Sequence, residues 1–269
     1  MLIPRLAHEI HHESHSVGPF QLHCRLENLR QHALVPLGGD QLLEQRQSGG
    51  GVANAIVGTI IIVALACLIG IPIGVGSGLF LAEYGSGRLG WVVRFVADVM
   101  NGTPSIVVGI FAWTWLVRPL GHFSALAGGA ALAVLMIPML ARTTEEMVRL
   151  VPNSLREAAL ALGYPRWRTS LGVVARTALG GIVTGGLVAV ARVAGETAPL
   201  LFTALGNLNF SMAVTEPMQT LSLQIYTYAT GPFDEWHRLA WAAALVLMGL
   251  VLLLSLTARW VTRKRYGAG

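Results

Sequence analysis

Residues 52–82 read VANAIVGTIIIVALACLIGIPIGVGSGLFLA, and no charged residue occurs until Glu83. A transmembrane helix needs roughly 20 apolar residues to cross about 30 Å of hydrocarbon. Inside lipid every backbone polar group must be satisfied within the protein, so only helices and closed β-barrels span a bilayer. This run is too long and too continuous for a barrel strand, and it therefore predicts a transmembrane α-helix.

Further apolar runs follow along the chain, at 95–117, 123–141, 177–205 and 239–258. Hydrophobic residues make up 54% of the chain and charged residues only 12%, whereas a soluble protein carries about a quarter charged residues. We therefore expect an all-α, polytopic transmembrane helical bundle of about five spans. It would occupy residues 52–262, between an atypical polar tail at 1–51 and a short tail at 263–269.

Basic residues predict the orientation of this bundle. Arginines are dense in the connection 142–176, and Arg263, Lys264 and Arg265 close the chain. Alternating connections place these segments on one side, which the positive-inside rule makes cytoplasmic. The connection 206–238 would then lie outside. Five spans would also place residues 1–51 outside, although nothing obvious in that tail would carry it across.

Glycines recur at intervals of four residues on two of the expected helices: Gly70, Gly74 and Gly78 on the first, and Gly181 and Gly185 on the fourth. Small residues at this spacing let helix backbones approach closely in lipid. The pattern predicts helix packing, with a gating hinge as the alternative.

The connection between the third and fourth runs contains its own helical signals. Ser154 followed by Glu157 predicts a capping box at the start of a short helix. Gly163 is placed to end that helix in the left-handed conformation, and Pro165 suits the first turn of another helix. The alanine-rich helix, flanked by arginines, would either dock into a groove of another protein or lie on the membrane surface.

The same segment carries a family resemblance. Glu157, Ala158 and Ala159, followed by Gly163, resemble the EAA loop of permeases from ABC importers. The resemblance implies a coupling helix that inserts into a cleft on an ATP-hydrolysing subunit. Arg156 and these four residues would form that coupling site.

Other segments narrow the resemblance to the phosphate-specific permeases, the PstA family. They are GVANAI at 51–56, PSIV at 104–107, RTTEEM at 142–147, LVP at 150–152, AGETAPLLFTA at 194–204, LQIY at 223–226 and EWH at 235–237. The resemblance covers about residues 50–260 and implies a multi-pass subunit of the bacterial inner membrane that imports phosphate. Another oxyanion, such as molybdate or sulfate, is the alternative substrate.

The resemblance also implies partners: a homologous permease of the PstC type, a dimer of ATP-binding subunits of the PstB type and a phosphate-binding protein of the PstS type. ATP and Mg²⁺ would be used by the ATPase partner, so we expect no cofactor and no metal on this chain. A phosphate-cradling loop needs Gly-Lys-Ser/Thr, whereas the only lysine is Lys264, preceded by Thr262 and Arg263. We therefore expect a transporter subunit and not an enzyme.

Two features depart from the family pattern. Family members carry prolines near the start of the helix after the coupling loop, where this chain has Arg176 and Gly180. Members also have one more span before the first run, and residues 1–51 do not resemble it. We therefore expect the five helices to be an incomplete six-span set. His8, His11, His12 and His15 have helical spacing that could bind a metal, but such a tail more often carries no site.

Charged residues inside the fourth run are candidates for handling an anion. Arg192 and Glu196 lie four residues apart and so would share a helix face. A charge inside a membrane is costly unless it is paired or faces a polar path. The two residues would form either an intrahelical ion pair or an anion path, in which Arg192 offers a guanidinium fork suited to phosphate oxygens.

Further candidates lie at the ends and breaks of other runs. Arg142 ends the third run and would either anchor it at the headgroups or line the exit of the path. Asn101, Thr103 and Ser105 surround Pro104, which should break the second run. This break would be a simple kink or a polar lining of the path.

Overall fold

The computed structural model describes residues 52–207, 210–232 and 234–266. The regular structure of the described part is helical, apart from one isolated bridge between Leu205 and Met218, and an irregular stretch joins α12 to α13. The predicted all-α fold is thus confirmed. The tail 1–51 and its four histidines lie outside the described residues, and the predicted domain limits stay untested.

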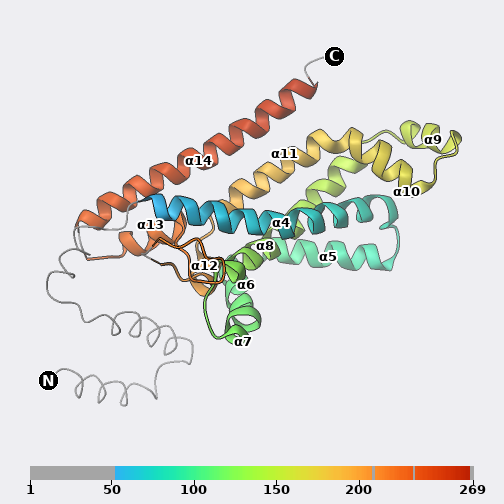
Figure 1. Cartoon of the computed structure of the whole chain (residues 1–269). Helices are drawn as coiled ribbons and strands as arrows, with labels where there is room; N and C mark the ends of the chain where they lie inside the picture. The colour runs from blue at the N-terminus through green and yellow to red at the C-terminus, as the bar shows by residue number, and fades with distance from the viewer. Residues whose placement is uncertain (1–51, 208–209, 233, 267–269) are drawn as a thin grey trace, which may run out of the picture. The chain divides into compact units, whose positions relative to one another are not determined.

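Long helices form the frame of the bundle (Figure 1). They are α4 (Val52–Tyr84), α8 (Ala125–Arg149), α11 (Ala175–Ala194) and α14 (Asp234–Tyr266). Within the described residues, 4 helices are long and apolar enough to cross a membrane, or 5 if a bent helix pair is counted as one span. The third and fourth spans run further into the connection 142–176 than the apolar runs predicted, because α8 continues to Arg149 and helical structure resumes at Arg166.

The second apolar run is the bent pair and not a straight span. Helix α5 (Arg88–Gly102) is followed by α6 (Ser105–Ala112), η1 (Trp113–Val117) and α7 (Arg118–Leu120). The chain bends by 105° between the two arms. Thr103 and Pro104 are extended, with ψ of 134° and 133°. Proline disfavours helical backbone in the residue before it, which accounts for Thr103.

Helices α4 and α8 pack closely along the glycine positions. Gly70 lies against Met136, Gly74 against Leu140 and Gly78 against Thr144. A side chain at any of these glycines would meet α8, so the predicted packing role is confirmed. The main hydrophobic core lies in this contact, around the buried side chains Ile62, Leu132, Met136 and Leu140.

The fourth apolar run is also broken. Helix α11 ends at Ala194, and the short helix α12 (Ala198–Thr203) follows after a turn. The chain then crosses the start of α8, where the Ala125 and Leu126 amides donate to the carbonyls of Glu216 and Val214 at 3.0 Å each. Helix α13 (Leu221–Ala229) follows, so the connection expected at 206–238 is partly helical.

Candidate functional site

The two helix breaks lie beside one cavity. The α5–α6 break and the α11–α12 break are brought together because α6 packs on α12, with Gly109 against Pro199. The cavity has a volume of about 290 Å³ and is lined by both breaks and by α8. A water molecule takes roughly 30 Å³ of liquid volume, so the cavity has room for several water molecules. We call it the break cavity; its lining is Met100, Asn101, Gly102, Thr103, Pro104, Ser105, Leu135, Met136, Met139, Arg192, Val193 and Glu196.

Arg192 contributes the positive charge of this cavity. It lies in the last turn of α11, where the helix dipole favours a cation. Its side chain is exposed and makes no hydrogen bond or ion pair within the described part of the chain. The five N–H donors of the guanidinium are therefore available to an anion in the cavity.

Glu196 lines the same cavity but not the same helix face. Because α11 ends at Ala194, Glu196 belongs to the break, and the predicted helical pairing with Arg192 is wrong. The backbone carbonyl of Glu196 accepts a hydrogen bond from Ser222 Oγ at 2.9 Å. This bond holds the backbone of the α11–α12 break against Ser222 at the start of α13. The Glu196 carboxylate makes no ion pair with Arg192.

The polar residues around Pro104 complete the lining. Asn101, Thr103 and Ser105 all face the break cavity. Thr103 Oγ1 donates to the Val99 carbonyl at 2.8 Å, which satisfies one carbonyl at the end of α5. The three residues named from the sequence therefore lie together in the fold, and their role in an anion path stays a prediction.

Arg142 is the one candidate path residue that lies elsewhere. Its Nε is 2.9 Å from Asp98 Oδ1, and its Nη1 is 3.1 Å from Glu145 Oε2. Glu145 Oε1 also lies 2.6 Å from Arg94 Nε and 2.6 Å from Arg149 Nη2. Arg142 belongs to this ion cluster between α5 and α8, and it does not line the break cavity.

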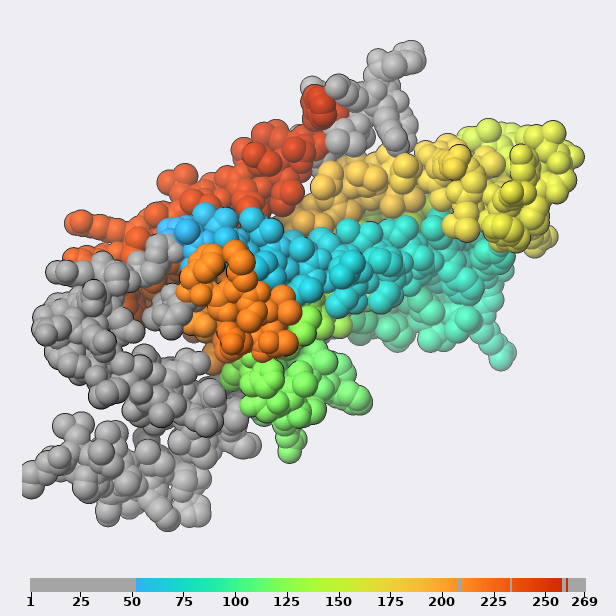
Figure 2. Space-filling model, in the orientation of Figure 1, coloured from blue at the N-terminus to red at the C-terminus, as the bar shows by residue number. Residues whose placement is uncertain are grey.

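The segment that is expected to contact an ATPase, residues 152–169, is called the coupling segment here. It forms α9 (Asn153–Ala161) and α10 (Arg166–Thr169) at the end of the bundle opposite to α12 and α13 (Figure 1). Figure 2 shows these residues as the yellow-green end of the molecule. The predicted capping box is wrong: Pro152 is the N-cap, and α9 has no side-chain cap. Ser154 lies inside the first turn, where its hydroxyl cannot cap the helix.

Gly163 ends α9 as predicted. Its φ of +83° is left-handed. The amides of Gly163 and Tyr164 donate to the carbonyls of Leu160 and Ala159 at 2.9 and 3.2 Å, the pattern of a Schellman motif. Pro165 then occupies the N-cap of α10, one position before the predicted first turn.

Arg156 holds the coupling segment to the bundle and does not point outward to a partner or to headgroups. Its Nη2 and Nη1 donate to the carbonyls of Val148 and Val151 at 2.9 and 2.7 Å, and its Nε donates to Glu83 Oε1 at 3.1 Å. Glu157 and Ala158 are exposed on α9, whereas Ala159 is buried against the bundle. These two exposed residues remain available for contact with a partner.

Comparisons with known proteins agree with this architecture. The family described as "Binding-protein-dependent transport system inner membrane component" matches residues 70–265. The chain is 48% identical over 221 residues to the phosphate transport system permease protein PstA of Yersinia pestis, covering 81% of this chain and 74% of that protein. It is 40% identical over 217 residues to a probable PstA of Methanocaldococcus jannaschii, covering 80% and 77% of the two chains.

The chain belongs to the PstA family of binding-protein-dependent transport permeases. It is similar in fold to an inward-facing structure of the MetNI methionine ABC transporter, with a TM-score of 0.62 at 18% identity over 85% of this chain and 99% of that chain. The predictions of a multi-pass membrane protein and of a permease subunit in place of an enzyme are confirmed.

Sequence reasoning missed two carboxylates of this PstA-family chain. Glu83 accepts hydrogen bonds from Arg156 and from Ser170 Oγ at 3.1 Å each, joining the end of α4 to the coupling segment. Glu145 is only 1% exposed and binds three arginines. The sequence does contain a signal for each of them. Glu83 is a single acidic residue at the end of a long apolar run, and Glu145 has arginines three residues before it and four residues after it.

Proposed function

We propose that this chain is a membrane-spanning permease subunit of an ATP-driven phosphate importer. The observation that carries the proposal is the break cavity, in which Arg192 makes no bond to other described residues and is surrounded by Asn101, Thr103 and Ser105. The names of the relatives favour phosphate over molybdate or sulfate as the anion.

Each polar group of the cavity has a chemical use in this proposal. The planar guanidinium of Arg192 binds two phosphate oxygens at once. The side-chain amide of Asn101 and the hydroxyls of Thr103 and Ser105 donate to the remaining phosphate oxygens. Glu196 supplies a negative charge that weakens the hold on the anion, so that the anion can leave; conduction requires binding that is favourable but not too strong.

A second, homologous permease would close the path. Arg192 and Asn101 are exposed in the single chain, although a charge at this depth in a span requires protein or water around it. A PstC-type subunit facing the break cavity would supply the other wall. A PstS-type binding protein would deliver the anion from outside.

Helix α9 would dock on the ATPase. Glu157, Ala158 and the strongly exposed Leu162 lie on the outer surface of the coupling segment, and small side chains allow close seating in a cleft. Arg156 would keep this helix rigidly joined to α8, so that movement of the ATPase is transmitted to the spans. In this arrangement the coupling segment and the C-terminus are cytoplasmic, as the arginines predict.

The test is transport by the full complex in proteoliposomes. We expect uptake of ³²P-phosphate that requires ATP, the ATPase subunit and the binding protein together. A tenfold excess of unlabelled phosphate should lower the labelled uptake by about tenfold, whereas sulfate and molybdate at the same excess should leave it nearly unchanged. Uptake without the ATPase, or stronger competition by sulfate or molybdate than by phosphate, would contradict the proposal.

A further inference from the structure

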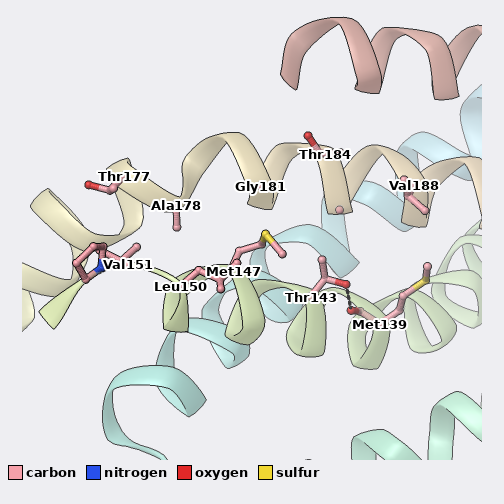
Figure 3. Close-up of a pocket in the computed structure, with 12 residues that line it drawn as sticks. Met139, Thr143, Met147, Leu150, Val151, Thr177, Ala178, Gly181, Thr184 and Val188 are labelled. Atoms are coloured by element: carbon pink, nitrogen blue, oxygen red, sulfur yellow. Dashed lines mark hydrogen bonds between the residues drawn. The ribbon is translucent and has the colours of Figure 1, made fainter. Parts of the chain in front are cut away.

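A second hollow lies on the same subunit, between α8 and α11 (Figure 3). It has a volume of about 720 Å³ and is lined by residues 139–152 on one side and 177–188 on the other. Its walls are mainly apolar, with Met147, Leu150 and Val188 among them. We call it the inner groove; it reaches Val151 and Pro152, where the coupling segment begins.

Met139 is common to the inner groove and the break cavity. Among the described residues that line either hollow, no other residue lines both. Figure 3 shows Met139 on α8 at one end of the groove, with Val188 on the opposite helix α11, and Leu150 and Val151 toward the other end. Met139 therefore borders both the polar hollow and the apolar one.

We propose that Met139 is the gate between the break cavity and the inner groove, closing the path to an anion until α8 moves. This proposal rests on the proposed function, because it assigns the break cavity to the anion. An apolar constriction excludes water and so stops an ion that must stay hydrated. Moving an ion into an apolar neck without a partner costs far more than burying a neutral polar group.

The backbone beside Met139 gives the gate a means of moving. Pro138 precedes it inside α8 and has no N–H to donate, which interrupts the helical ladder and favours a bend. Thr143 Oγ1 donates to the Met139 carbonyl at 3.0 Å, a back-bond that often bends helices further. Helix α8 is thus weakened at the gate.

The coupling segment can act on this weak point. Helix α9 follows α8 after a short linker, and Arg156 binds the carbonyls of Val148 and Val151 at that junction. A displacement of α9 therefore moves the end of α8 directly. With α8 bending at Pro138, the displacement would change the position of Met139 between the two hollows.

The gate is tested by passive leak in proteoliposomes that hold the complete complex and are preloaded with ³²P-phosphate, without ATP. We expect Met139→Ser to release phosphate about tenfold faster than the unmodified chain, because a small polar residue lets water into the neck. Met139→Leu should release phosphate as slowly as the unmodified chain, because leucine is also large and apolar. The matched control is Met147→Ser, since Met147 lines only the inner groove.

A cysteine variant compares the same folded complex before and after a change at residue 139. Met139→Cys, in a chain with Cys24→Ser and Cys67→Ala, should be tight in the assembled complex. Treatment of the same vesicles with a positively charged methanethiosulfonate should then open the leak, because it places in the neck a hydrated positive charge that attracts the anion. Complete modification, checked by mass spectrometry, with no change in leak would overturn the gate.

The remaining outcomes separate the gate from the proposed function. If the unmodified complex takes up phosphate with ATP but Met139→Ser assembles and stays tight, the gate is wrong and the proposed function stands. Equal leaks from Met139→Ser and Met147→Ser would also overturn the gate. If the unmodified complex takes up no phosphate, the proposed function fails and the gate fails with it.

Discussion

Arg94 Nε donates a hydrogen bond of 2.6 Å to Glu145 Oε1 and so joins α5 to α8. The same arginine donates through Nη1 and Nη2 to the carbonyls of Gly85 and Leu81, both at 2.8 Å. These are carbonyls at the end of α4 and in the turn that follows it. One side chain thus fixes three helices around a buried carboxylate.

We expect Glu145→Gln to destabilise the subunit by about 3 kcal/mol, because it removes the buried carboxylate that three arginines share and leaves Asp98 to pair with Arg142 alone. Thermal unfolding of the purified protein in detergent measures the change. Glu146→Gln is the control, since Glu146 is the exposed neighbour on the same helix. Equal melting temperatures for the two variants would contradict a structural role for Glu145.

Arg192→Gln should abolish phosphate uptake while the complex still assembles. Glutamine keeps some hydrogen-bonding capacity but loses the charge and the fork that hold an oxyanion. Uptake in proteoliposomes and co-purification of the partners are the two measurements. Arg176→Gln is the matched control, because Arg176 is exposed on the same helix and does not line the break cavity. Normal phosphate uptake by Arg192→Gln would refute a role for Arg192 in the anion path.

Arg156→Gln should weaken the association with the ATPase subunit. The change removes the ion pair to Glu83 and leaves the Val148 and Val151 carbonyls without their donor, at a local cost of about 2 kcal/mol. Co-purification yield measures the association. Arg166→Gln, an exposed residue of the same segment, should have little effect, and a similar loss in both variants would point to surface charge as the cause.

Gly163→Ala should disturb the end of α9, since a side chain at φ +83° costs about 1 kcal/mol or more. We expect a lower co-purification yield of the ATPase subunit with no loss of the permease itself. Gly172→Ala is the control because a Cβ at Gly172 would meet open space and its φ is not positive. Undiminished recovery of the ATPase with Gly163→Ala would refute the need for this cap.

Gly74→Val should reduce the yield of folded subunit, because its Cβ would lie 2.6 Å from Leu140 Cβ and 3.1 Å from the Ile137 carbonyl. Overpacking of this kind typically costs about 1–3 kcal/mol. Size-exclusion chromatography after detergent extraction gives the folded fraction. Gly76→Val should behave normally, since nothing lies within 4 Å of a Cβ at Gly76.

Periodic and compositional signals predicted the elements of this fold well. The apolar runs located the spans but not the breaks in the second and fourth runs. The four-residue glycine spacing on the first run marked the α4–α8 contact, and Gly163 marked the end of α9. Boundaries were less accurate: α8 extends to Arg149 and α9 begins before Ser154. Polar residues continue a helix wherever tertiary contacts satisfy them, and hydropathy does not report such contacts.

The sequence by itself determined that this chain is a membrane-embedded helical protein, because long apolar runs leave the backbone no other way to satisfy its hydrogen bonds in lipid. Its permease family followed from the resemblance of its motifs and not from its apolar runs. Only the tertiary structure decided which charges share a site. It separated Arg142 from the break cavity, because Asp98 and Glu145 bind it. It also ended the helix of Arg192 at Ala194, before Glu196, and placed Met139 in the lining of both hollows. Helix ends and contacts between distant segments, such as Arg142 with Asp98, depend on packing that hydropathy does not report.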